Sequence, residues 1–193
     1  MNPPGFAGLL RVVCGQLISD AAAEAIWARL RALPGDPLSP GGLLVLNDAA
    51  LCGAAGLSRP KAAAARAVAR AALDGRLRLA SLPEMPDEAA VAHLCAVPGL
   101  GPWSARAFLA LSECRPDVFP DGDAALAISL AALRGLPARP APREMAREAL
   151  AWRPWRGLAA RLLWHHRRGV RTRPRGGSAG SHAPGSNQPL AAP

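Results

Sequence analysis

The 193-residue chain has no tyrosine, a single threonine (Thr172) and only three isoleucines. Sheets normally draw on β-branched and aromatic residues, so this shortage argues against a sheet-rich domain. No stretch approaches about eighteen apolar residues without a charge, so we expect no transmembrane helix and no membrane partner. The first residues lack a basic region followed by an apolar core and a cleavage site. We therefore expect no secretory signal and a cytoplasmic location.

Cysteine is scarce as well. The four cysteines stand far apart and form no C-x-x-C motif: Cys14, Cys52, Cys95 and Cys114. This spacing matches neither a zinc site nor an iron–sulfur cluster. We therefore expect buried, reduced thiols and no metal ligands among them.

Basic residues exceed acidic ones, 23 to 14, for a formal net charge of +9, and Lys61 is the only lysine. This balance favours a polyanionic partner, with nucleic acid first and a membrane surface second. Strong GC bias in the coding DNA would also enrich arginine. Residues 167–193 hold five arginines, no acid and no aromatic residue, and thus +5 of the +9. They predict a disordered basic tail, either inert or an arm that adds DNA affinity, after a folded body over residues 1–166.

Hydrophobic periodicity indicates an all-α body. Apolar residues at i, i+3, i+4, i+7 and i+11 predict a first helix whose stripe runs from Phe6 to Leu17. Asp20 is expected to cap a second helix that ends near Leu33, before a Pro/Gly connector. Further helices are expected over residues 48–55, 58–73, 87–96, 102–113, 123–134, 143–152 and 155–166.

Residues 97–101 read V-P-G-L-G and separate two apolar helices. The glycines allow a tight turn with exposed backbone N–H groups, beside the positive end of the helix that opens at Pro102. Such amides bind phosphate without a basic side chain, and Leu100 would pin the two helices together. The pattern is that of a helix–hairpin–helix DNA-binding element, with Val97, Gly99, Leu100 and Gly101 as its backbone contacts.

Downstream, residues 117–123 read D-V-F-P-D-G-D and precede another apolar helix. Together with the hairpin they resemble the helix–hairpin–helix DNA glycosylase superfamily, and more closely its DNA-3-methyladenine glycosylase II family. The segment G-Q-L-I-S at residues 15–19 is similar to that family's G-Q-L-V-S, and W-R-P-W-R at 152–156 to its closing W-x-P-W-R. The likeness extends from about Gly5 to His166 and implies the family's helical fold, without the N-terminal sheet domain of longer members.

The resemblance makes Asp123 the catalytic aspartate, which faces the anomeric carbon of a flipped nucleotide. A fixed carboxylate suits this reaction because cleavage of an N-glycosidic bond places positive charge on the sugar. Asp117 and Asp121 are rivals, although only Asp123 stands at the family's fifth position counted from Phe119. Without that context, an aspartate before a helix is more often an N-cap.

Other matches supply a wedge and a base pocket. Leu17 corresponds to the residue that enters the minor groove, and Gln16 would sit beside it against the neighbouring pair. Trp103 and Trp164 match aromatic residues that stack on the cationic base, where Ala107 replaces a tyrosine of the best-known member. Leu17, Trp103 and Trp164 also each have a plain structural interpretation as core residues.

The expected function is therefore that of a monofunctional DNA glycosylase that excises alkylated purines of the 3-methyladenine type from duplex DNA, acting as a monomer. Trp103 occupies the position of the lysine of bifunctional glycosylase/lyases, so strand cleavage is not expected. We expect no cofactor, although a monovalent cation could sit on hairpin carbonyls near Gly99 and Gly101. Arg59, Lys61 and Arg106 flank the predicted DNA-facing turns and could touch phosphate. The alternatives are a catalytically impaired DNA-binding module and a glycosylase for another damaged or mismatched base.

Overall fold

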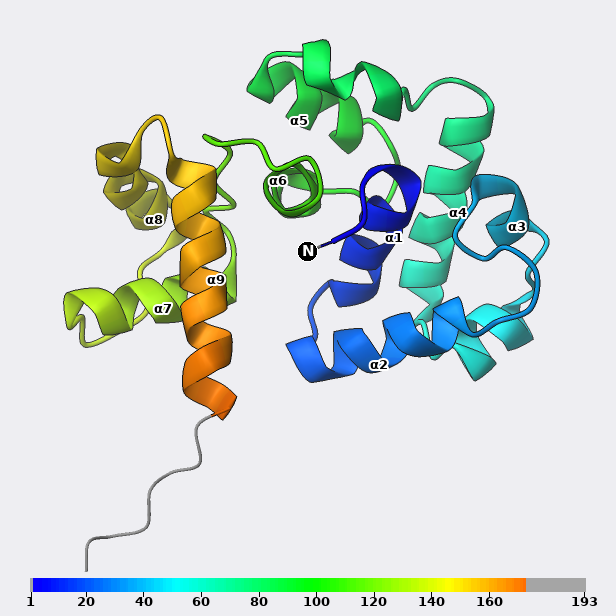
Figure 1. Ribbon diagram of the computed structural model, residues 1–193, viewed down its shortest axis with the longest axis horizontal. Helices are drawn as coiled ribbons and strands as arrows, with labels where there is room; N and C mark the ends of the chain where they lie inside the picture. The colour runs from blue at the N-terminus through cyan, green and yellow to red at the C-terminus, as the bar shows by residue number, and fades with distance from the viewer. Residues whose placement is uncertain (1, 173–193) are drawn as a thin grey trace, which may run out of the picture.

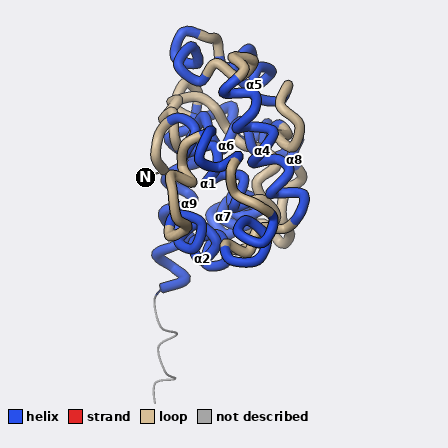
Figure 2. The backbone as a smooth tube through the Cα atoms, turned by 90° about the vertical axis from the view of Figure 1, so that its right-hand side faces the viewer, coloured by secondary structure: helices blue, strands red, loops and turns tan. Residues whose placement is uncertain are grey.

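The computed structural model describes residues 2–172, which fold into helices joined by short connections and contain no β-strand (Figures 1 and 2). This confirms the all-α prediction. None of the helices in this part of the chain has the length and apolar content needed to cross a bilayer. The elements are α1 (Gly5–Gly15), α2 (Asp20–Arg31), α3 (Pro40–Leu44), the π-helix η1 (Ala49–Ala54), α4 (Arg59–Leu73), the 3₁₀ helix η2 (Leu79–Glu84), α5 (Asp87–Cys95), α6 (Pro102–Leu111), α7 (Ala124–Arg134), α8 (Pro142–Ala149), the 3₁₀ helix η3 (Leu150–Trp152) and α9 (Arg156–Thr172).

The larger of two hydrophobic cores lies among α1 to α6. Its fully buried members include Leu9, Leu30, Leu94 and Phe108, which come from four different helices. The alanine-rich sequence of α4 favours helix and keeps its surface flat, so α1 and α3 both pack closely against it. This lobe forms the right-hand part of Figure 1.

The smaller core lies among α7, α8 and α9. Leu126, Leu130, Met145 and Ala160 are completely buried there, with Trp164 packed against them. The chain passes from the larger core to the smaller one between Val118 and Phe119. In Figure 1, α9 is the helix of this smaller group that lies nearest the larger lobe, and it also contacts α6.

The first helix is shorter than its apolar stripe predicts. α1 ends at Gly15, and Leu17 lies beyond it with a left-handed backbone (φ +57°) and a fully exposed side chain. Leu17 is therefore not the core residue that the stripe indicates. The cap of α2 also differs, because the hydroxyl of Ser19, one residue before Asp20, accepts the N–H of Ala22.

Two elements have no counterpart in the sequence prediction: α3, capped by the hydroxyl of Ser39, and η2. The expected helix over 48–55 is present as the π-helix η1. α9 continues to Thr172, past the end predicted at His166, so the first residues assigned to the tail are helical. The remaining tail, residues 173–193, lies outside the described part of the chain.

Candidate active site

A cleft of about 770 Å³ opens between the two lobes. Its lining comes from α1, α2 and the turn between them, and from α6, α7 and α9. The candidate residues that line it are Gln16, Leu17, Trp103, Ala107, Asp123 and Trp164. Residues separated by more than a hundred positions in sequence thus border one cavity.

Asp123 lies at the start of α7 with 7% of its surface exposed. Its Oδ1 accepts the backbone N–H of Leu126 at 2.8 Å, so it is the N-cap of that helix. The indole N–H of Trp103 donates to Oδ2 at 2.8 Å, and that of Trp164 donates to Oδ1 at 3.2 Å. Within residues 2–172 no ion pair involves Asp123. The carboxylate is therefore oriented by three neutral donors at the cleft wall, and its charge is not cancelled by a cation.

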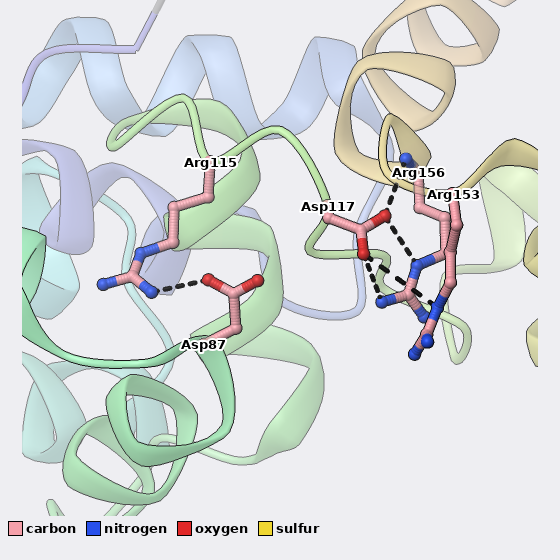
Figure 3. A network of polar contacts seen from close by, with 5 residues as sticks. All are labelled: Asp87, Arg115, Asp117, Arg153 and Arg156. Carbon is pink, nitrogen blue, oxygen red and sulfur yellow. Dashed lines mark hydrogen bonds and ion pairs between the residues drawn. The ribbon is translucent and has the colours of Figure 1, made fainter.

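The rival aspartates face a separate, smaller cavity of about 220 Å³. Asp117 accepts two hydrogen bonds from the guanidinium of Arg156 and lies 4.0 Å from Arg153, as Figure 3 shows. These hydrogen bonds from Arg156 hold the pKa of Asp117 below its usual range. Asp121 pairs with Arg106 at 3.0 Å. Both carboxylates are thus neutralised by arginine, unlike Asp123.

The two tryptophans of the cleft come from different lobes. Trp103 lies in the first turn of α6 and is packed against the larger core, whereas Trp164 on α9 is packed against the smaller one. Both are partly buried, and both turn the indole N–H toward Asp123. Ala107, one turn after Trp103, is only 1% exposed, and it adds no bulky side chain to the lining of the cleft.

Leu17 combines two unusual properties, complete exposure and positive φ. A branched side chain seldom adopts this backbone, which costs free energy of the order of 1 kcal/mol. The neighbouring Gln16 is half-buried, and its Nε2 donates to the carbonyl of Gly99 at 3.0 Å and to Oγ of Ser104 at 2.9 Å. Sequence reasoning does not single out Ser104, which carries no signal beyond its place in the first turn of α6.

The hairpin is held by its own backbone and by α4. Gly99 has φ +90°, and a Cβ there would stand 2.4 Å from Cβ of Ala64, so only glycine fits. Val97 and Leu100 are each 4% exposed and anchor the turn, and their backbone N–H groups donate to the carbonyls of Leu94 and Val97. External contacts of the hairpin backbone would therefore have to come from the N–H groups of Gly99 and Gly101. The carbonyl of Gly99 accepts from Gln16 and that of Gly101 from Ala105, so a cation there would use the second lone pair of each oxygen.

Two basic residues expected near phosphate are engaged inside the protein. Lys61 is 8% exposed and donates to the backbone carbonyl of Cys14 at 2.8 Å, which stabilises the C-terminal end of α1. Burial lowers the pKa of Lys61 and raises the pKa of the Cys14 thiol to about 12. Arg106 is bound to Asp121. Residues 2–172 contain no group of three or more histidine, cysteine, aspartate or glutamate side chains placed to hold a metal ion.

The chain is also similar to known proteins. The family model described as "HhH-GPD superfamily base excision DNA repair protein" matches residues 10–155. DNA-3-methyladenine glycosylase 2 of Escherichia coli K12 is 29% identical over 166 residues, which cover 81% of this chain and 55% of that protein. A "probable bifunctional transcriptional activator/DNA repair enzyme AlkA" of Mycobacterium tuberculosis is 39% identical over 72 residues, 37% of this chain and 14% of that protein. The match thus spans about half or less of these two relatives.

The fold is shared with solved structures. The 3-methyladenine DNA glycosylase Mag1 of Schizosaccharomyces pombe, in complex with abasic DNA, superposes with a TM-score of 0.76 at 25% identity. The superposition covers 81% of this chain and 77% of that one. Hence most of the helical fold is shared with that structure.

Proposed function

Because the chain belongs to the HhH-GPD superfamily of base excision DNA repair proteins, we propose that it is a monofunctional DNA glycosylase for alkylated purines of the 3-methyladenine type. It acts as a monomer on duplex DNA, flips the damaged nucleotide into the cleft and hydrolyses its N-glycosidic bond. The relatives named above support the choice of substrate.

The observation that carries this proposal is the environment of Asp123. Its carboxylate lies at the wall of a cleft large enough for a flipped nucleotide, with both oxygens directed by neutral N–H donors. Hydrogen bonds from neutral groups orient an anion without cancelling its charge. The site thus presents a fixed negative charge to any ligand in the cleft.

This charge matches the reaction. When the bond from C1′ to the base nitrogen breaks, the electron pair leaves with the base and the sugar acquires oxocarbenium character. An oriented anion stabilises that transition state more than bulk water does, because it needs no reorganisation as the charge develops. Water then adds its oxygen to C1′ and loses a proton. No cofactor is required, and any cation on the hairpin carbonyls would be structural.

Trp103 and Trp164 would bind the flipped base. An alkylated purine carries positive charge, so it is attracted to an electron-rich indole face by stacking and cation–π interaction. With both N–H groups bound to Asp123, the two rings are fixed before a ligand arrives. Selectivity then comes largely from the lesion, whose glycosidic bond is already weak.

Leu17 and the hairpin are the parts that we expect to contact the DNA duplex. An exposed leucine at the mouth of the cleft can fill the space that a flipped nucleotide leaves in the duplex. The backbone amides of the hairpin can hold the phosphates nearby. Ala107 also lines the cleft, and its small side chain leaves more room there for the base.

The same residues argue against strand cleavage. A lyase step of the Schiff-base type needs a primary amine at C1′, but the residue beside Asp123 is Trp103. The chain's only lysine, Lys61, is buried against Cys14 and does not line the cleft. The function that fits is therefore hydrolysis alone.

The test compares two substitutions on methylated duplex DNA. Asp123→Asn retains an N-cap oxygen, so the fold should persist, while release of 3-methyladenine should fall about 100- to 1,000-fold. Asp121→Asn, two residues away and paired with Arg106, is the matched control and should retain most of the activity. Excision by the Asp123→Asn protein at the wild-type rate would contradict the mechanism.

A panel of lesion oligonucleotides separates the alternatives. Release of 3-methyladenine supports the proposal, and release of only a deaminated or mismatched base identifies a glycosylase of different specificity. Damage-dependent binding without release of any base identifies a DNA-binding module that has lost catalysis.

A further inference from the structure

The side chain of Gln16 joins two segments that the proposed function uses separately. Gln16 immediately precedes the exposed Leu17, and its amide nitrogen donates to Gly99 in the hairpin and to Ser104 in the first turn of α6. These partners are 83 and 88 residues away in sequence. A single amide therefore links residues 16–19, here called the wedge segment, to the hairpin at residues 97–101.

Both N–H groups of that amide are used within the protein. One serves the Gly99 carbonyl at 3.0 Å and the other the Ser104 hydroxyl at 2.9 Å, so neither is free for the edge of a base. Ser104 is 3% exposed and cannot reach DNA. The sequence-based expectation that Gln16 rests against the neighbouring base pair stays a prediction, and such a contact would have to use the amide oxygen Oε1.

The helix behind these segments holds them from the other side. On α4, Lys61 donates to the carbonyl of Cys14 at the end of α1, and one turn later Ala64 is in contact with Gly99. The end of α1, which precedes the wedge segment, and the hairpin thus both contact α4, and the side chain of Gln16 joins the wedge segment to the hairpin directly.

We propose that Gln16 and Ser104 are positioning residues that couple the hairpin to the wedge. When the hairpin binds a phosphate, the Gln16 amide holds Leu17 at a fixed place relative to that phosphate, so that anchoring and wedge insertion occur as one event. This inference rests on the proposed function, because it assigns Leu17 and the hairpin their DNA contacts.

The first test measures how strongly the protein prefers a duplex with a tetrahydrofuran abasic-site analogue over the same undamaged duplex. Undamaged DNA engages the hairpin alone, whereas the analogue also leaves space for Leu17. Ser104→Ala, which removes one hydrogen bond of the Gln16 amide, should reduce the preference about fivefold, and Gln16→Leu, which removes both, should reduce it at least as much. Neither variant should change the affinity for undamaged DNA by much. Ser129→Ala, which removes another buried hydroxyl far from the hairpin, should leave the preference unchanged.

The double variant distinguishes coupling from direct DNA contact. If the two side chains act through their mutual hydrogen bond, the double variant should be no worse than the more impaired single one. If Gln16 instead acts by touching a base, Ser104→Ala should have no effect or the two losses should add. Either of these results would overturn the proposal.

A charge variant supplies a readout that a purely structural role would not alter. In Gln16→Glu the carboxylate has no proton to donate to the Gly99 carbonyl, so the preference should fall at about pH 8. Below about pH 4.5 the carboxyl is protonated and can donate one hydrogen bond, so the preference should partly recover. Wild type at the same pH values provides the baseline, and a loss that does not depend on pH counts against the coupling.

Hydrogen exchange in the free protein tests the link between the two segments without relying on DNA binding or base release. Gln16→Leu and Ser104→Ala should both raise amide exchange in residues 16–19 and 97–101, with Ser129→Ala as control. Unchanged exchange there would refute the coupling even if the wild type is a working glycosylase. If exchange rises but the wild type shows no preference for the abasic analogue, the proposed function fails and the structural link stands.

Discussion

Arg156 holds Asp117 through two separate donors, Nε to Oδ1 and Nη2 to Oδ2, each at 2.8 Å. Asp117 belongs to the loop that leads to Asp123, and Arg156 is the first residue of α9, which carries Trp164. The pair therefore fixes the start of α9 relative to the loop that precedes α7 (Figure 3).

This pair predicts how stability depends on pH. Because the folded-state pKa of Asp117 lies below its unfolded value, its contribution is present above about pH 4 and is lost as the pH falls through the folded-state pKa. At about pH 7, Asp117→Asn should cost about 1 kcal/mol, or about 2–4 °C in Tm. The difference from wild type should disappear near pH 2 in thermal melts. Asp74→Asn is the comparison. The hydrogen bond from Arg76 also lowers the pKa of Asp74, but this pair is exposed and screened by solvent, so its loss should change Tm less than the loss of Asp117 does. A difference that persists at low pH would contradict this origin.

Trp103 and Trp164 predict a graded effect on catalysis. Trp103→Phe keeps an aromatic face but removes the 2.8 Å hydrogen bond to Asp123, so base release under single-turnover conditions should fall about tenfold. Trp164→Phe should cost less, because its bond is longer and Oδ1 keeps the N–H of Leu126. Trp155→Phe, on an exposed ring outside the cleft, should have no effect. Equal rates for all three variants would show that the indole N–H groups do not orient the carboxylate.

Leu17 predicts a substitution that separates stability from activity. Leu17→Gly removes a fully exposed side chain and relaxes a left-handed backbone, so Tm should stay the same or rise. Base excision should nevertheless fall about tenfold or more, because nothing then fills the space of the flipped nucleotide. Val45→Ala trims another highly exposed residue and should leave both quantities unchanged. A drop in Tm with normal excision would indicate that Leu17 is structural.

The hairpin glycines predict two different defects. Gly99→Ala should lower Tm, because it combines positive φ with a Cβ only 2.4 Å from Ala64. At Gly101 no atom lies within 4 Å of the place that a Cβ would occupy, so Gly101→Ala should fold normally and yet weaken DNA binding if phosphate approaches the backbone there. Gly53→Ala, equally unhindered but in η1, is the control for binding. DNA affinity is measured by fluorescence anisotropy at fixed salt. Normal affinity of the Gly101→Ala protein would show that no phosphate approaches the backbone at Gly101.

The chemistry beside Asp123 predicts the fate of abasic DNA. With Trp103 at the cleft and Lys61 buried, borohydride should trap no covalent complex through a lysine side chain, and duplex with an abasic site should remain uncut. Gel analysis of trapped species, with Lys61→Arg as comparison, tests this. A trapped complex that is lost with Lys61→Arg would show that the lysine reaches the sugar.

Local patterns predict most of the helices but not how they meet. The run of alanines around Ala64 favours helix by itself, and glycine at position 99 is explained by the turn that it forms. The predicted end of α1 is wrong because Leu17 continues the apolar stripe, although the helix stops at Gly15. A five-residue helix such as α3 has too few positions for periodicity to be seen.

The site is predictable only as far as the resemblance extends. Asp123 follows from the motif, but its bonds to Trp103 and Trp164 connect elements 20 and 41 residues away, which no local rule joins. The role of the Ser104 hydroxyl has no local signal at all, since its partner, Gln16, lies 88 residues away. A basic residue such as Lys61 is expected at the surface, whereas burial of its stem places the amine on Cys14.

The exposed, left-handed Leu17 also has an evolutionary consequence. In the free protein this residue contributes strain and no burial, so selection for stability alone would replace it. Its retention would have to come from an encounter with another molecule, where the same side chain becomes buried. A library screened only for thermostability should therefore lose leucine at this position early, whereas one screened for repair of damaged DNA should keep it.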